Sequence, residues 1–154
     1  MNHRSKRFDP GKWAEDEARK WLEARSLADA HFAYHRYPDA RSAQGSLAAQ
    51  PADYLVAQGS SFPGQAHRAW HLEVKETAQE NRLPKAKIRQ YGLLKKFDWA
   101  SFRTVVLVFR SAFNDWVYLT SDDLFNHDEV PASFSMKGKK SFPTHAEALQ
   151  EIFG

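Results

Sequence analysis

The chain has 154 residues, of which 42% are hydrophobic and 27% are charged, and this balance predicts one globular domain with its own core. The net charge of +3 is mildly basic, no stretch approaches the ~20 apolar residues of a membrane-spanning helix, and the N-terminus lacks the apolar segment of a secretory signal, so we expect a cytoplasmic protein. The absence of cysteine excludes disulfides, a thiolate nucleophile and a Cys-ligated zinc site.

The first half of the chain predicts a helix followed by three strands. Residues 1–10 are polar and basic and are expected to form a flexible tail, ahead of a single domain over residues 11–154. Asp9 and Pro10 are typical of a helix start, and apolar spacing extends this helix to about Arg25. Alternating side chains and flanking turn residues predict the strands, at residues 31–37, 53–57 and 70–75.

The second half predicts a helix, a hairpin and two short helices. Pro84 is expected to open a helix that runs to about Phe97. The apolar run at residues 103–109 predicts a central strand buried on both faces, with residues 115–119 as its hairpin partner. Ser121 and Thr144 are expected to cap the short helices. The whole order predicts an α/β fold with a mixed central sheet flanked by helices.

Positive charge is concentrated around the predicted second helix. Between residues 82 and 96 there are six basic residues and no acidic one: Arg82, Lys85, Lys87, Arg89, Lys95 and Lys96. Acidic residues gather elsewhere, at residues 15–17 and 122–129. This separation indicates a surface that contacts DNA phosphates, and the alternative is a solvated helix face.

Two carboxylates and a lysine form the most informative pattern. The sequence Pro51-Ala52-Asp53 is followed, one predicted hairpin later, by Glu73-Val74-Lys75. On a strand, Glu-x-Lys places the two charged groups on one face, about two residues' rise (~6.6 Å) apart. If Asp53 lies at the same level of the neighbouring strand, the converging oxygens suit Mg²⁺, which also accepts phosphate oxygens. The alternative is an amphipathic strand with one solvated face.

This pattern resembles the motif of the PD-(D/E)xK nuclease superfamily. The first predicted helix is similar to that of the superfamily's resolvase-like branch, because positions 11, 15, 18 and 22 match G-x-x-x-E-x-x-A-x-x-x-L. This match selects Glu15, with Glu17 as the alternative carboxylate. Residues 82–84 (Arg-Leu-Pro) and 88–90 (Ile-Arg-Gln) are similar to RecU-type and phage Holliday-junction resolvases.

The resemblance implies a restriction-endonuclease-like fold and metal-dependent hydrolysis of phosphodiester bonds in DNA, with branched DNA as the substrate. It implies Mg²⁺, replaceable by Mn²⁺, and a set of ligands for it: Glu15, Asp53, Glu73 and the backbone carbonyl of Val74. It also implies that Lys75 acts at the reacting water, that Gln90 is a supporting active-site residue, and that the protein is a homodimer.

Two other functions remain open at this point. A nuclease of the same fold could act on linear or flap DNA as a restriction or repair enzyme. A non-catalytic DNA-binding module, in which the acidic residues are structural, is the third alternative. The sequence contains no G-x-x-x-x-G-K-[ST] loop, so we expect no nucleotide cofactor.

Overall fold

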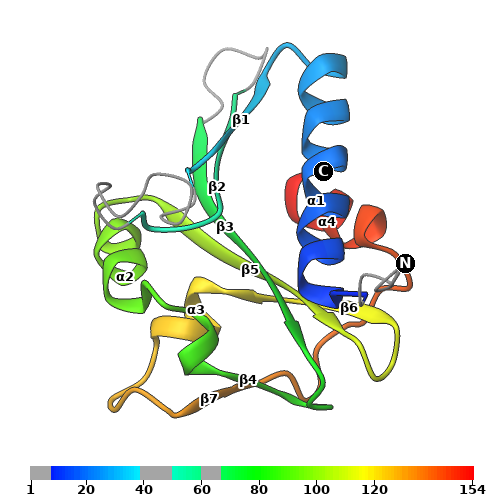
Figure 1. Ribbon diagram of the computed structural model, residues 1–154. Coiled ribbons are helices and arrows are strands. Elements are labelled where there is room, and N and C mark those ends of the chain that lie inside the picture. Colours follow the sequence, from blue (N-terminus) through cyan, green and yellow to red (C-terminus); the bar gives the residue numbers. More distant parts are fainter. Residues whose placement is uncertain (1–7, 39–49, 60–66) are drawn as a thin grey trace, which may run out of the picture.

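The computed structural model describes residues 8–38, 50–59 and 67–154, which form a five-stranded sheet, a two-stranded sheet and several helices (Figure 1). The large sheet contains β1 (Phe32–Arg36), β2 (Tyr54–Gln58), β3 (Arg68–Thr77), β5 (Arg103–Arg110) and β6 (Asp115–Thr120), in the order β1-β2-β3-β5-β6. Only the β3–β5 pair is parallel, so the sheet is mixed. The predicted hairpin of β5 and β6 is confirmed.

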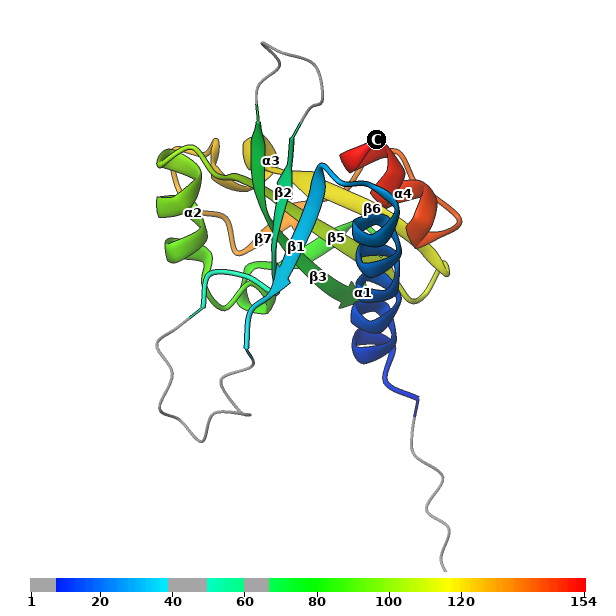
Figure 2. The same cartoon turned by 90° about the horizontal axis from the view of Figure 1, so that it is seen from above.

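Helices cover both faces of the large sheet, as Figure 2 shows from above. On one face, α1 (Pro10–Ala28) and α4 (His145–Phe153) bury Leu22 and Phe153 in one hydrophobic cluster. On the other face, α2 (Tyr91–Trp99), α3 (Ser121–Phe125) and the small sheet of β4 (Arg82–Pro84) and β7 (Ser133–Ser135) enclose a second cluster. The predicted fold class, a mixed central sheet flanked by helices, is confirmed.

Strand β5 lies between these two clusters, as its unbroken apolar sequence predicted. Val105 and Leu107 face the cluster under α1, whereas Val106 and Val108 face the cluster under α2. Because successive side chains of a strand point to opposite faces, a strand covered on both sides needs apolar residues at every position.

The first helix begins as predicted. The Asp9 carboxylate accepts hydrogen bonds from the backbone N–H groups of Gly11 and Lys12, and Pro10 is the first residue of α1. Of the predicted flexible tail, residues 1–7 lie outside the described residues. Thr144 caps α4 as expected, but α3 is capped by Thr120 and not by Ser121.

The prediction of one helix from Pro84 to Phe97 is wrong. Pro84 ends β4, a short 3-10 turn, η1, occupies Lys85–Lys87, and α2 begins only at Tyr91. The reason is the small sheet: Leu83 is fully buried opposite Phe134. An extended residue before a proline fits a helix N-cap as well as a strand, as Asp9 before Pro10 shows, so it is the pairing with Phe134 that places Leu83 in a strand.

Candidate active site

The carboxylates and the lysine of the sequence motif lie where β2 ends and β3 continues. Strand β2 pairs with β3 only from Gln58 opposite Arg68 to Tyr54 opposite Leu72, whereas β3 extends to Thr77 along β5. Beyond the end of β2 there is a cavity of about 810 Å³, which we call the acidic hollow. The predicted residues that line it are Glu15, Asp53, Glu73, Val74, Lys75, Lys87, Arg89 and Gln90.

Asp53 lies opposite Glu73, because it precedes Tyr54 by one residue and Glu73 follows Leu72 by one residue in the antiparallel register. The Asp53 carboxylate accepts a hydrogen bond of 2.8 Å from the backbone N–H of Val74 and so takes the place of the next ladder bond. In a strand, the N–H and C=O of one residue point to the same side. The carbonyl of Val74 therefore also points toward the side on which Asp53 lies.

Glu73 and Lys75 form an ion pair, with 2.9 Å between the Glu73 carboxylate and the Lys75 ammonium. Only 8% of the Glu73 side chain is exposed. Burial raises the pKa of Glu73 above its ordinary value and the Asp53 carboxylate raises it further, although Lys75 acts in the opposite direction. Burial lowers the pKa of Lys75, but Glu73 and Asp53 outweigh this effect and its net shift is upward. The Lys75 ammonium therefore does not offset the combined effect of burial and of Asp53 on the Glu73 carboxylate.

Glu15 reaches the hollow from α1. Burial raises the pKa of Glu15, Asp53 adds to this shift, and Arg36 opposes it from 3.3 Å away. Glu15 lies beyond the first turn of α1, which contains no acidic residue, so stabilisation of the helix N-terminus does not explain its position. The alternative carboxylate, Glu17, does not line the hollow and contacts Lys20 and His145.

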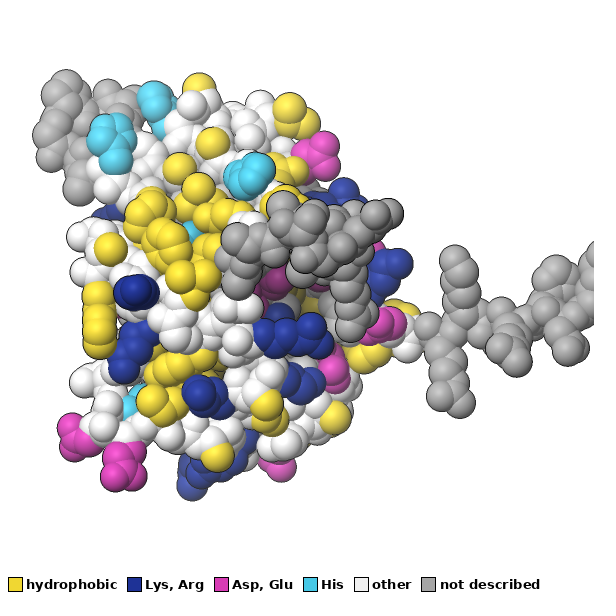
Figure 3. Space-filling view, turned by 60° about the vertical axis from the view of Figure 1, so that its left-hand side comes forward, with side chains coloured by type: hydrophobic (Ala, Val, Ile, Leu, Met, Phe, Trp, Pro, Cys, Tyr) yellow, Lys and Arg dark blue, Asp and Glu magenta, His cyan; other side chains and the backbone are white. Residues whose placement is uncertain are grey.

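Three residues of the predicted DNA-binding and supporting set reach the hollow from the segment before α2: Lys87, Arg89 and Gln90. The other four residues of the predicted DNA-binding set do not line the hollow. Arg82 donates a hydrogen bond to Ser133, Lys85 and Lys95 lie over aromatic rings, and Lys96 is exposed on α2. In the space-filling view, Lys and Arg side chains lie near acidic ones on the face turned forward (Figure 3).

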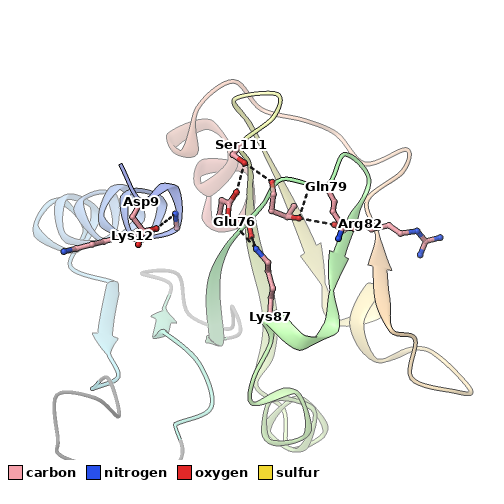
Figure 4. A network of polar contacts seen from close by, with 9 residues as sticks. Asp9, Lys12, Glu76, Gln79, Arg82, Lys87 and Ser111 are labelled. Carbon is pink, nitrogen blue, oxygen red and sulfur yellow. Dashed lines mark hydrogen bonds and ion pairs between the residues drawn. The ribbon is translucent and has the colours of Figure 1, made fainter. Parts of the chain in front are cut away.

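Glu76 is a residue of the hollow that sequence reasoning missed. Its carboxylate accepts a hydrogen bond of 2.6 Å from the Ser111 hydroxyl and lies 3.6 Å from the Lys87 ammonium, which also donates to the Glu76 backbone carbonyl (Figure 4). Lys87 is thus fixed to β3 at the wall of the hollow. Arg36 and Lys12 were also missed. The sequence could have indicated Lys12, because it lies one helical turn before Glu15 on the same face of the helix.

Among the described residues, no group of three His, Asp or Glu side chains is arranged to hold a metal ion. The donors around the hollow nevertheless suit Mg²⁺ or Mn²⁺ in kind, since they are carboxylates and a backbone carbonyl. The raised pKa of Glu73 beside Asp53 fits a divalent cation too, because such a cation would relieve the repulsion between the two carboxylates.

No protein-family model and no curated protein sequence matches the chain. Among solved structures, the chain is similar to Hjc, a Holliday junction resolvase from the archaeal hyperthermophile Archaeoglobus fulgidus. The two chains are 15% identical, the match covers 90% of this chain and 98% of that one, and the TM-score is 0.46. The function proposed below therefore rests on the geometry of the acidic hollow. No helix in the described part of the chain is long and apolar enough to cross a membrane.

Proposed function

We propose that the protein is a Mg²⁺-dependent DNA endonuclease of the PD-(D/E)xK type, which hydrolyses phosphodiester bonds. The observation that carries this proposal is the strand register that sets Asp53 opposite Glu73, with the Lys75 ammonium 2.9 Å from the Glu73 carboxylate. Two carboxylates and a lysine from adjacent strands at one cavity are the minimum set that the superfamily motif requires.

The roles follow from the chemistry of each group. Asp53, Glu73, Glu15 and the Val74 carbonyl would hold the ion, whose chemistry, when bound, is to polarise the phosphoryl group and lower the pKa of a water molecule. Lys75 would orient the attacking water and offset the charge that grows on the phosphate. Gln90, which also lines the hollow, would support the active site by holding the DNA strand or the water. The reaction forms a bond from water oxygen to phosphorus and breaks one ester bond to a sugar oxygen.

The proposed substrate is branched DNA, and the four-way Holliday junction is the preferred candidate. The proposed enzyme is a homodimer, which carries two acidic hollows. Lys87 and Arg89 line the hollow and would contact phosphates near the cut. The basic residues that do not line it, Arg82, Lys85, Lys95 and Lys96, would contact further phosphates of the DNA. Cleavage of junction, flap and linear duplex of one sequence distinguishes a resolvase from a restriction or repair nuclease.

A non-catalytic DNA-binding module is the second candidate, and specific contacts favour it. Lys75 already pairs with Glu73, and Lys87 with Glu76, so lysines neutralise part of the acidic hollow without an ion. Calorimetric titration with Mn²⁺ separates the two candidates: absence of metal binding, with DNA binding retained, would establish the module.

The deciding experiment is incubation of the protein and a synthetic four-way junction with Mg²⁺. We expect the wild type to nick the junction, and Asp53→Asn and Lys75→Ala to abolish nicking while junction binding is kept. Asp16→Asn is the matched control, because Asp16 is a partly exposed carboxylate of α1 that pairs with Arg19 outside the hollow. Equal nicking by Asp53→Asn and Asp16→Asn would overturn the proposal.

A further inference from the structure

A second, smaller hollow of about 450 Å³ adjoins the acidic hollow. The two hollows share Ala86 and Arg89 as lining residues, so they lie side by side along the segment that leads into α2. The smaller one is otherwise lined by Lys85, Tyr91 and Gly92 among others, and no described residue in its lining is acidic. Its lining is therefore basic, whereas the described lining of its neighbour contains five acidic and five basic side chains.

Lys85 is held in place at this hollow from both ends. Its backbone N–H donates to the carbonyl of Ala132 over 2.9 Å, and its ammonium lies 5.0 Å from the centre of the Tyr91 ring. The Tyr91 ring is itself fixed, because its hydroxyl donates a hydrogen bond of 2.5 Å to the buried carbonyl of Leu124. A cation held in this way loses less conformational freedom when it binds an anion than a free lysine would.

Gly92 is the second residue of α2, and nothing in the described part of the chain requires a glycine there. A Cβ atom at this position would meet no atom within 4 Å, and its backbone has no positive φ. Glycine in a helix is less stable than alanine, so its presence needs another reason. A common reason is that a ligand approaches the backbone closely.

We propose that this second hollow binds a phosphate of the nucleic-acid backbone, next to the phosphate that enters the acidic hollow. This subsite rests on the proposed function, because it assumes that a DNA strand runs along the two adjoining hollows. Arg89, which lines both, bridges neighbouring positions on the strand, and its planar guanidinium suits two phosphate oxygens. Lys85 supplies a fixed charge, and Gly92 leaves the space in which the phosphate lies against the start of α2.

The test is DNA binding without divalent metal, measured by fluorescence anisotropy of a labelled junction in EDTA over a range of NaCl concentrations. For Lys85→Gln we expect weaker binding and a salt slope smaller by about 1. For Gly92→Ala we expect binding weaker by about 3-fold or more, with an equal or higher melting temperature, because alanine fills the space but favours the helix. Lys20→Gln is the matched control, since it removes one exposed positive charge from α1 outside both hollows.

The subsite is overturned if Gly92→Ala and Lys85→Gln bind as the wild type does, or if Lys20→Gln lowers affinity and slope equally. Inorganic phosphate at matched ionic strength tests the other source of this ligand. If phosphate alone stabilises the wild type and this effect disappears in Gly92→Ala while DNA affinity does not change, the hollow binds free phosphate and the proposal is wrong.

The outcome is separable from that of the proposed nuclease function. A wild type that binds the junction through this subsite but never nicks it with Mg²⁺ keeps the subsite and removes the nuclease. A wild type that nicks the junction while Gly92→Ala and Lys85→Gln bind normally keeps the nuclease and removes the subsite.

Discussion

Asp123 and Glu73 each pair with a lysine, but their surroundings shift the pKa of the two carboxylates in opposite directions. Asp123, at the start of α3, lies 2.5 Å from the Lys139 ammonium and accepts hydrogen bonds from the backbone N–H and the hydroxyl of Thr120. Burial alone would raise the pKa of Asp123, but these contacts lower it below its ordinary value. The surroundings of Asp123 therefore favour the ionised form.

Glu73 has one lysine as well, but it is more deeply buried and faces a second carboxylate. Burial and Asp53 raise the pKa of Glu73 in spite of Lys75. A lysine partner alone therefore does not show whether the ionised carboxylate stabilises the fold. The negative charge of Asp123 stabilises the start of a helix, whereas the negative charge of Glu73 opposes folding. Ionisable groups whose pKa is shifted by burial and by a nearby like charge are concentrated at functional sites.

The largest expected difference between the two carboxylates is in catalysis. Glu73→Gln should lower the single-turnover rate of junction cleavage by roughly a hundredfold or more, because the proposed Mg²⁺ site loses a charged ligand and with it the ion that polarises the phosphoryl group. Asp123→Asn should cut at the wild-type rate but unfold more easily, by about 1 kcal/mol, since a helix cap is weakened. Similar rates for Glu73→Gln and the wild type would place Glu73 among the structural carboxylates.

The two carboxylates should also give opposite dependences of stability on pH in metal-free protein. The pKa of Glu73 is raised from 4.5, so its contribution to stability is present below pH 4.5 and lost as pH rises through the raised pKa. The pKa of Asp123 is lowered from 3.8, so its contribution is present above pH 3.8 and lost as pH falls through the lowered pKa. Urea unfolding of wild type, Glu73→Gln and Asp123→Asn over a range of pH measures both contributions to stability.

For Glu73, the free energy of unfolding of the wild type relative to Glu73→Gln should fall by about 1 kcal/mol or more between acidic and mildly alkaline pH. The difference between wild type and Asp123→Asn should stay constant above pH 3.8 and shrink only at lower pH. A wild type that gains stability over Glu73→Gln as pH rises would mean that Lys75 outweighs burial.

A bound divalent metal ion should remove the destabilisation that the ionised Glu73 carboxylate causes. At saturating Mn²⁺, we expect the wild type to gain about 1–3 kcal/mol of stability, because an ion that binds only the folded state stabilises it. Glu73→Gln should gain much less, and Asp123→Asn should gain as much as the wild type. Thermal denaturation with and without Mn²⁺ measures these differences, and equal gains in all three proteins would indicate binding elsewhere.

The sequence predicted the part of this site that depends on local pattern. The alternation of β3 placed Glu73 and Lys75 on one face, and they do form an ion pair. The resemblance of the first helix to the resolvase-like branch selected Glu15, which lines the hollow. What local pattern left open was the register of Asp53, because the β2–β3 connection is long and its length does not fix the pairing.

The error around α2 has a different physical origin. Helical spacing and a proline predicted one basic helix, but the tertiary pairing of Leu83 with Phe134 determined the backbone there. The consequence is functional: the basic residues come from a strand, a turn and a helix, and only Lys87 and Arg89 of them line the acidic hollow. Glu76 was missed for the same reason, since its partners Ser111 and Lys87 lie far from it in sequence.

The smallest expected effect on cleavage concerns Ser111, which holds the Glu76 carboxylate beside Lys87 (Figure 4). Ser111→Ala removes one hydrogen bond to a charged group, so stability should fall by about 1–2 kcal/mol and the Lys87 ammonium should become less fixed. If Lys87 positions the strand, the KM for junction DNA should rise about 2- to 5-fold while kcat changes less, because ground-state and transition-state binding weaken together. Ser111→Thr keeps the hydroxyl and should restore the KM. A KM that stays at the wild-type value in Ser111→Ala, with the loss of stability observed, would make the Ser111–Glu76–Lys87 contacts purely structural, as those of Asp123 are.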